Sequence, residues 1–283
     1  MSLVLLNLAL APPPFVKFDP NPAHWTAVPV PPKLPAGNRA VWEYAANGSK
    51  LEWRVASGKE SVRAGLGGER PVLPTGLPKT IKREYGRTAL RVSDGWLVGT
   101  NHGEFGGSLS WFSIDGKAHR KVTDDLIVAF FRLPDGIYAV EGLSHMGISF
   151  GSILRIDRPS PKGAWRATKV VNLPEAPDAV AARKDGTAIL VLDDLVAAFR
   201  PGVPLRILYG NAPWLEFYPN SAVLSADERK LYIGMRQFVG ELDLHTKALR
   251  LLVPSRAHLN RLSTDDEQTV RYDADLLQRH RKP

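Results

Sequence analysis

The sequence contains no cysteine among its 283 residues. This absence excludes disulfide bridges, thiolate metal sites and cysteine nucleophiles. It leaves the compartment open, because a periplasmic protein can fold without disulfides and a cytosolic protein usually does. Whatever the chain binds or catalyses must therefore depend on other side chains.

Long amphipathic helical patterns are also missing, while glycine and proline are frequent, with 24 and 23 residues. Because 44% of the residues are hydrophobic and 23% are charged, the chain can bury a sizeable core. These features favour an ordinary globular protein of the all-β class. No phosphate-binding loop, dinucleotide fingerprint or Gly-x-Ser-x-Gly elbow occurs in the strand-to-helix context that each requires, so those functional classes are set aside.

Clusters of one charge sign are scarce, although the formal net charge is +8 and the sequence pI is near 9.7. The basic residues are scattered along the chain and form a short cluster only at residues 279–282. Because a nucleic-acid site needs a concentrated basic surface, a nucleic-acid partner is not expected.

The first 11 residues, MSLVLLNLALA, form an apolar run about half as long as a membrane span requires. The run ends in Ala9-Leu10-Ala11, which is typical of a signal-peptide cleavage site, yet no Lys or Arg precedes it and Pro12 would follow the cut. An apolar strand is the alternative. We expect residues 1–14 to be signal-like or disordered, with no transmembrane segment, and residues 15–283 to form one domain. A signal would place the protein in the periplasm or outside the cell, and a cytoplasmic location stays open.

Two sequence markers recur along the chain with a common period. The first marker is a turn between two β-like runs that begins with an acidic or amide residue. Successive turns begin 47, 41, 50 and 42 positions apart. The second is an apolar residue before a polar one at a strand end, with spacings of 42, 43 and 43. The turns lie at Asn47-Gly48, Asp94-Gly95, Asp135-Gly136, Asp185-Gly186 and Asp227, and the strand ends at Ile114-Asp115, Ile156-Asp157, Phe199-Arg200 and Leu242-Asp243.

A period in the low forties with several short strands per unit is typical of a propeller blade, a small sheet of four antiparallel strands. The N-terminal stretch FVKFDPNPAHWTAVPVPP resembles the second half of a unit, and the C-terminal stretch NRLSTDDEQTVRYDAD resembles a first half. We therefore predict a six-bladed propeller whose last blade is closed by both termini, with five or seven blades as the alternatives. If so, deleting residues 15–32 should destroy the whole fold.

On this repeat and strand pattern the chain resembles the β-propeller superfamily over essentially its whole length. A count of six is similar to the gluconolactonase, strictosidine-synthase-like and NHL-repeat groups. The Gly-His and Trp-Asp dipeptides of WD repeats are not in register, and the Ser-x-Asp-x-Gly-x-Thr-Trp box of sialidases is absent. Because the metal ligands of the lactonases have no match residue by residue, the resemblance implies a fold and no catalytic residue.

Loop lengths single out units two and three. From the turn to the strand end there are 21 residues between Asp94 and Asp115 and 22 between Asp135 and Asp157, against 15 and 16 in units four and five. The extra residues are NHGEFGG and GLSHMGISF, which lie on the same predicted face. They could form a metal or acid-base site, with His102, Glu104 and His145 as candidate ligands of a divalent cation, or a recognition surface, or only a turn.

The remaining candidates lie on the same face in units four and five. Asp193 and Asp194 occupy a short loop, where a pair of carboxylates is typical of either a solvated turn or a calcium site. The favoured hypothesis is a non-enzymatic propeller that presents one loop face to a macromolecular partner, with a protein favoured, as an extracytoplasmic inhibitor or envelope factor. The alternative is a metal-dependent hydrolase or lyase that acts on a small-molecule ligand at the channel mouth. The predicted binding residues are His102, Glu104, Glu141, His145, Asp193, Asp194, Trp214 and Arg236.

Overall fold

The computed structural model describes residues 21–29, 51–56, 61–66, 73–84, 88–160, 163–214, 217–236 and 238–253. The signal-like segment 1–14, the Asn47-Gly48 turn, the predicted C-terminal half-blade and the basic cluster 279–282 lie outside these residues. Within the described ranges, no helix is both long and apolar enough to cross a membrane.

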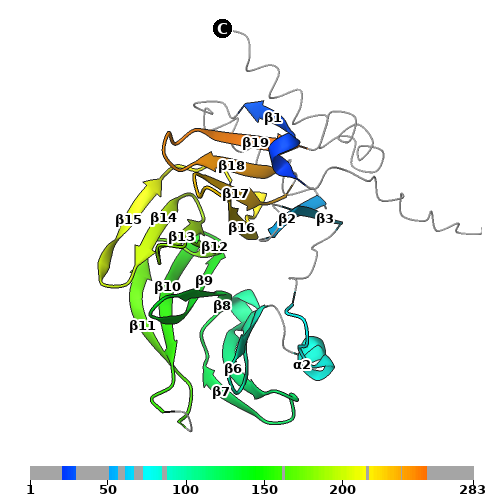
Figure 1. The fold of residues 1–283 in the computed structure, drawn as a ribbon, viewed down its shortest axis with the longest axis vertical. Coiled ribbons are helices and arrows are strands. Elements are labelled where there is room, and N and C mark those ends of the chain that lie inside the picture. Colours follow the sequence, from blue (N-terminus) through cyan, green and yellow to red (C-terminus); the bar gives the residue numbers. More distant parts are fainter. Residues whose placement is uncertain are drawn as a thin grey trace, which may run out of the picture.

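Three sheets of four antiparallel strands follow one another along the chain, each with its strands paired in sequence order. A fourth set of four strands continues the pattern (Figure 1). The first two sheets comprise β4 (Thr88–Val92), β5 (Gly95–Asn101), β6 (Gly107–Ser113) and β7 (His119–Thr123), then β8 (Ile127–Leu133), β9 (Gly136–His145), β10 (Ile148–Asp157) and β11 (Arg166–Leu173).

The next two sets of strands have the same order. They comprise β12 (Pro177–Ala182), β13 (Ala188–Leu192), β14 (Val196–Arg200) and β15 (Val203–Tyr209), then β16 (Ser221–Leu224), β17 (Lys230–Gly234), β18 (Val239–Asp243) and β19 (Leu249–Val253). Successive sheets of four antiparallel strands are blades, so the predicted propeller-type fold is confirmed.

The predicted acidic turns join the first two strands of these blades. At Asp185 the side-chain Oδ1 accepts a hydrogen bond of 2.9 Å from the backbone N–H of Thr187. Gly186 follows with a φ of +84°, and a Cβ there would lie 3.1 Å from the Cδ of Pro134 in the neighbouring blade. Both the backbone conformation and the close approach therefore require glycine at this position.

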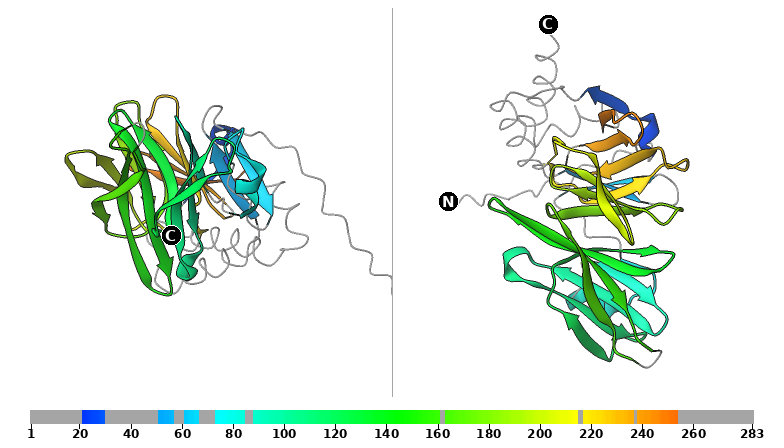
Figure 2. Two further views of the ribbon diagram at one scale, coloured as in Figure 1. Left: turned by 90° about the horizontal axis from the view of Figure 1, so that it is seen from below. Right: turned by 90° about the vertical axis from the view of Figure 1, so that its left-hand side faces the viewer.

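The blades pack face to face (Figure 2). Apolar side chains from both neighbouring blades fill the space between them. Strand β13 has the continuously apolar sequence AILVL because it lies between two blades. Ile189 and Val191 enter the core shared with β16–β19, while Leu190 and Leu192 enter the core shared with β8–β11. A strand that is buried on both faces has no polar side to alternate with.

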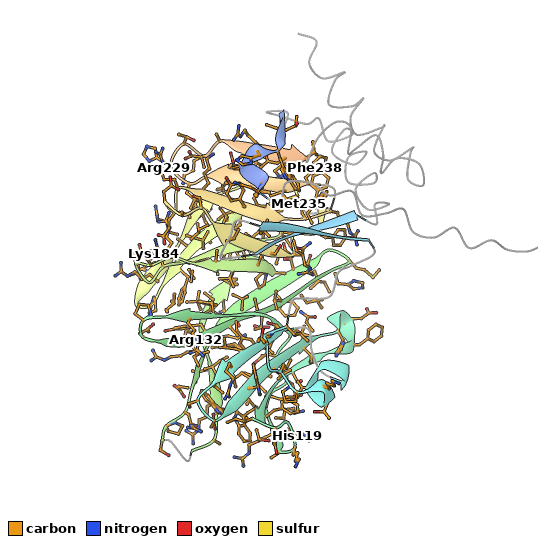
Figure 3. The ribbon with its side chains drawn as sticks, turned by 45° about the vertical axis from the view of Figure 1, so that its right-hand side comes forward. His119, Arg132, Lys184, Arg229, Met235 and Phe238 are labelled. Atoms are coloured by element: carbon orange, nitrogen blue, oxygen red, sulfur yellow. The ribbon has the colours of Figure 1, made fainter. Side chains whose placement is uncertain are left out.

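The two ends of each blade define two faces of the molecule. Figure 3 shows Arg132, Lys184 and Arg229, which lie in or next to the turns between first and second strands, along one side. Met235 and Phe238, from the connection between β17 and β18, lie on the other side. We call these sides the turn face and the loop face.

The N-terminal strand corrects the prediction of a shared blade. Strand β1 (Thr26–Pro29) pairs antiparallel with β19, from Thr26 opposite Val253 to Pro29 opposite Arg250, and so becomes a fifth strand of the β16–β19 sheet. It does not lie in a separate blade. An outermost strand exposes unpaired backbone groups, and the added strand covers that edge.

A hairpin occupies the place where the shared blade was expected. It consists of β2 (Leu51–Ala56) and β3 (Ser61–Leu66), and its Trp53 packs in one cluster with Tyr232 and Val239 of the β16–β19 sheet. The backbone N–H of Trp53 donates to the carbonyl oxygen of Met235 at 3.0 Å. In the described part of the chain no strand separates this hairpin from β16–β19, and six blades stays a prediction.

Three short helical segments complete the described structure. They are η1 (Pro22–His24), α2 (Lys79–Glu84) and η2 (Gly103–Phe105). Ile81 of α2 and nearby Leu77 are buried against Trp96, Val98 and Phe112 of the β4–β7 blade. The residues around Lys79 therefore form a short helix that covers one side of this blade, and they do not show the alternating pattern of a strand.

Candidate functional site

The first lengthened loop runs from Asn101 to Gly106 and is built around the single turn η2. The backbone N–H of His102 donates to the carbonyl oxygen of Gly106 at 2.8 Å, which closes the loop at its base. Gly103 and Gly106 have φ angles of +64° and +93°. Because only glycine adopts these angles readily, the glycine-rich sequence is what permits so tight a loop.

The second lengthened segment is a β-hairpin, which corrects its prediction as a loop. The GLSHMGISF residues continue β9 and β10 to a two-residue turn at Met146 and Gly147, whose φ angles are +48° and +82°. Along β9, Glu141 is the last residue that pairs with β8, and along β10, Gly151 is the first residue that pairs with β11. The hairpin tip therefore extends beyond the strands on either side of it.

Asn101 ties the two segments together. Its side-chain Nδ2 donates to the carbonyl oxygen of Gly142 at 2.9 Å, and its Oδ1 accepts from the backbone N–H of Gly103 at 2.9 Å. One amide group thus joins the η2 loop to the base of the β9–β10 hairpin. Sequence reasoning missed Asn101, and the available signal was its place as the last residue of β5 before the glycine-rich loop.

Two of the predicted binding residues meet at this junction. The Nε2 of His145 lies 3.3 Å from the Oε2 of Glu104, and both side chains are about half exposed. The His102 side chain is exposed and does not cap η2. Among the described residues, no three His, Asp or Glu side chains gather closely enough to hold a metal ion.

Four large apolar side chains are exposed on the same two segments. The exposed fractions are 83% for Phe105, 88% for Met146, 60% for Ile148 and 44% for Phe150. Ile148 pairs with His145 across the hairpin, so it lies on the face that Glu104 approaches. Phe150 lies on that face too, two residues further along the strand. We call these four residues the loop-face patch.

Glu141 does not belong to this surface, contrary to its predicted place in the binding set. It is buried within the blade, where it accepts a hydrogen bond from the hydroxyl of Ser152 and lies 3.7 Å from the Nζ of Lys169. A buried carboxylate requires such partners because its charge has lost its water. In this structure Glu141 accepts a hydrogen bond and pairs with a positive charge inside the sheet.

Asp193 and Asp194 form part of a carboxylate cluster in the neighbouring blade. The hydroxyl of Ser149, on the hairpin, donates to Oδ2 of the buried Asp193, and the backbone N–H of Ala176 donates to that hydroxyl oxygen at 2.8 Å. The backbone N–H of Asp194 donates to the Oε2 of Glu175 at 3.0 Å. The hairpin is therefore held on both sides, by Asn101 on one and by Asp193 on the other.

Burial and carboxylate repulsion shift two pKa values in this cluster. Burial, together with the charges of Asp194 and Asp193, raises the pKa of Glu175 to about 7. Burial is also the largest cause that raises the pKa of Asp178 well above its ordinary value, and the charges of Asp193 and Glu175 add to it. Sequence reasoning found Asp193 and Asp194 but missed Glu175 and Asp178, because only the fold brings β12 beside the β13–β14 turn.

Trp214 and Arg236, the last predicted residues, are separated from the loop-face patch. Trp214 is fully buried, and its indole Nε1 donates to the carbonyl oxygen of Leu192 at 3.1 Å. It is therefore not a surface anchor. The guanidinium carbon of Arg236 lies 3.9 Å from the ring centroid of Tyr218, which is partly exposed.

Comparisons with known proteins find similar folds and no family. No protein family model matches the chain, and no curated protein is similar to it. Solved structures do match, among them an auxiliary nutrient binding protein from Bacteroides ovatus, with 13% identity and a TM-score of 0.40 over 81% of this chain and 48% of that one.

Two further matches have comparable scores. The Dos1 propeller has 12% identity and a TM-score of 0.38, over 58% of this chain and 45% of the other. A gluconolactonase from Xanthomonas campestris has 14% identity and a TM-score of 0.36, over 56% and 58%. In all three cases the chain spans less than two thirds of the matched protein. The group includes both binding proteins and enzymes, so it assigns no function to this chain.

Proposed function

We propose that this protein is a binding module that docks another protein on the loop-face patch, and that it works without catalysing a reaction. The observation that carries the proposal is the gathering of Phe105, Met146, Ile148 and Phe150 on two adjacent projecting segments. Single exposed apolar residues are ordinary on a protein surface, but several side by side mark interaction sites.

The residue types support a protein partner. Aromatic side chains and methionine are enriched in the cores of protein interfaces, and a polar rim usually surrounds them. Glu104 and His145 provide such polar groups next to the patch, and the exposed His102 adds a third. The predicted residues His102, Glu104 and His145 thus become rim contacts around apolar anchors that the sequence had not singled out.

The support beneath the patch also fits a binding role. Asn101 holds the base of the hairpin through the carbonyl of Gly142, and Ser149 holds its other side through Asp193. A loop that is held in place before it meets its partner loses less conformational freedom on binding. The patch is therefore presented by a supported hairpin.

The test is site-specific photo-crosslinking in cells that naturally contain the protein. A photoreactive amino acid replaces Met146, whose exposed position makes it tolerant of change. We expect crosslinks to one other protein, and we expect them to be lost when Phe105→Ser and Phe150→Ser are introduced together, because a few buried anchors supply most of an interface's energy.

The matched control places the same change elsewhere on the surface. Val203 and Ile207 of β15 are exposed to 52% and 50%, and they lie on an outermost strand away from the hairpin. The double variant Val203→Ser and Ile207→Ser should leave the crosslinks intact. The proposal fails if no protein is crosslinked, if the crosslinked protein is a second copy of this chain, or if both double variants behave alike.

A further inference from the structure

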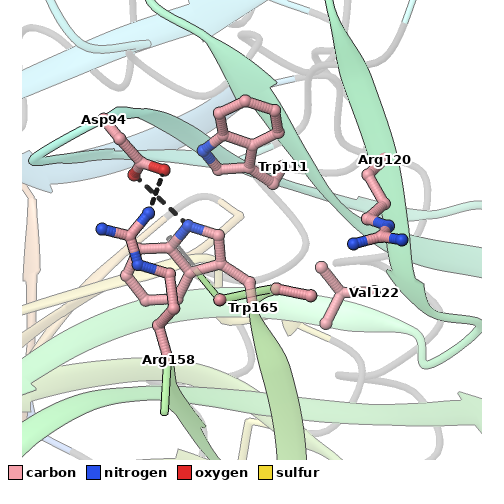
Figure 4. Close-up of a pocket in the computed structure, with 8 residues that line it drawn as sticks. Asp94, Trp111, Arg120, Val122, Arg158 and Trp165 are labelled. Carbon is pink, nitrogen blue, oxygen red and sulfur yellow. Dashed lines mark hydrogen bonds and ion pairs between the residues drawn. The ribbon is translucent and has the colours of Figure 1, made fainter. Parts of the chain in front are cut away.

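A separate pocket opens on the turn face, between β7 and the connection from β10 to β11 (Figure 4). Its volume is about 420 Å³, which is within the range of small-molecule sites. We call it the turn-face pocket. Its lining residues in the described ranges are Asp94, Trp111, Arg120, Val122, Arg158, Gly163, Ala164 and Trp165.

One wall is a closed network of charges. Arg158 forms an ion pair with Asp94, in which both side chains are mostly shielded from solvent. The indole Nε1 of Trp165 donates to the other carboxylate oxygen of Asp94 at 3.3 Å, and the Arg158 guanidinium carbon lies 5.3 Å from the Trp165 ring centroid. The negative charge of Asp94 is thus neutralised within the wall, and both of its oxygens have donors.

The opposite wall carries a cation that has no such partner. The guanidinium group of Arg120, on β7, is exposed to solvent and makes no ion pair or hydrogen bond with any residue in the described part of the chain. Figure 4 shows its side chain beside Val122, across the pocket from the Asp94–Arg158 pair. The lining residues that the structure describes therefore carry two positive charges and one negative charge, which is a net charge of +1.

The remaining surface of the pocket is flat and apolar. Trp111, Trp165 and Val122 line it, and all three pack against the apolar core between the first two blades. Indole rings favour flat apolar groups, which they contact by stacking or edge to face. A guanidinium group favours a planar carboxylate, which it binds through two parallel hydrogen bonds.

We propose that the turn-face pocket binds a small organic monoanion, namely a planar aromatic ring that carries one carboxylate. The ring lies against Trp111 and Trp165, and the carboxylate pairs with Arg120. One negative charge balances the net charge of the lining, whereas a neutral ring leaves Arg120 without an anion. This inference is independent of the loop-face patch, because the two sites use different residues on opposite faces.

Isothermal titration calorimetry tests the inference with two probes of nearly the same shape, of which only one carries a charge. Indole-3-acetate and its neutral amide, indole-3-acetamide, are titrated into the full-length protein. We expect the acid to bind at least about tenfold more tightly than the amide, because only the acid forms a charge-assisted pair with Arg120. Equal affinities, or no binding of the acid at millimolar concentration, would overturn the assignment.

A pair of variants locates the charge effect. Arg120→Gln should weaken binding of the acid at least about tenfold and should hardly affect the amide. The matched control is Arg206→Gln, since Arg206 is an exposed arginine on β15, the outermost strand of another blade. Circular dichroism checks that both variants are folded. If the control weakens binding as much as Arg120→Gln does, the pocket is not the site.

Discussion

The connection between the second and third strands has opposite properties in two neighbouring blades. In the β8–β11 blade, β9 and β10 each span ten residues and end in an exposed turn that carries Met146. In the β12–β15 blade, β13 and β14 each span five residues, and the turn between them contains the buried Asp193. The same position in the repeat therefore exposes apolar side chains in one blade, whereas most side chains at this position are buried in the next.

Strand length relative to the neighbouring strands explains the difference. The β9–β10 hairpin runs past the ends of β8 and β11, so no sheet packs on its tip. Strands β13 and β14 end level with their neighbours and lie between two blades, so both of their faces are covered. Whether an apolar side chain is buried depends on whether a neighbouring strand or blade packs against it, and the hydrophobicity of the residue alone does not determine this.

The largest expected effect contrasts a buried residue beside the short turn with an exposed one on the hairpin. Trp214→Ala should lower the free energy of unfolding by about 3–5 kcal/mol, because it leaves a cavity in the core and removes the donor to Leu192. Met146→Ala should change that free energy by less than about 0.5 kcal/mol. Equilibrium unfolding in urea measures both, and similar midpoints would contradict the contrast.

An intermediate effect is expected from the residue that supports the hairpin. Asn101→Ala removes the hydrogen bonds to Gly142 and Gly103, which should cost about 1–2 kcal/mol and loosen both segments. Hydrogen exchange should speed up at the backbone amides around Gly103. The control is Asn172→Ala, an exposed asparagine on β11, which should leave exchange in this region unchanged.

The smallest expected effect concerns pH and the carboxylate cluster beside the short turn. The pKa of Glu175 is about 7 in the folded protein, above its ordinary value of 4.5, so the folded state holds the proton more tightly than the unfolded state does. The free energy of unfolding should therefore fall as the pH rises from about 4.5 to 7. Glu175→Gln should remove this part of the fall and stabilise the protein above neutral pH by about 1 kcal/mol, since Glu175 is partly solvated.

A second carboxylate supplies the opposite sign as a control. Hydrogen bonds from the Ser225 hydroxyl and the Arg229 amide hold the pKa of Asp227 below its ordinary value. Asp227→Asn should therefore be less stable than wild type at neutral pH, and this deficit should vanish on acidification. Glu175→Gln should be more stable than wild type at neutral pH, and this gain should vanish below about pH 4.5. The stability of the variant minus that of wild type should thus fall with rising pH for Asp227→Asn and rise for Glu175→Gln. Thermal melts across this range measure both, and the same pH trend in the two variants would refute the assignment.

Sequence reasoning predicted the repeat well and the ends poorly. The turn at Asp185-Gly186 and its equivalents were recognisable because a tight hairpin requires particular residue types. The position of Thr26–Pro29 could not be predicted in the same way, because a short strand can pair with any unpaired sheet edge within its reach. In the structure it pairs with β19. The predicted sixth blade was assembled from sequence similarity, which carries no information about which edge is open.

The candidate site was predicted in outline only. The excess length of two segments pointed to Glu104 and His145, and the structure brings their side chains to 3.3 Å; that they bind a partner stays a prediction. Glu141 was included by the same count, and Trp214 by its place on the connection before the fifth unit, where a core position was the alternative; both are buried. A count of residues cannot distinguish a loop from a longer hairpin, and it cannot show which side of a strand faces a neighbouring blade.

The sequence by itself determined the blade period, the turn positions and the all-β class, because these depend on local backbone chemistry and on alternation along one strand. Only the tertiary structure decided that Phe105, Met146, Ile148 and Phe150 are exposed together and that Arg120 faces a pocket without an ionic partner among the described residues. Exposure and pairing are properties of contacts between distant segments, and those contacts exist only after the blades have packed against one another.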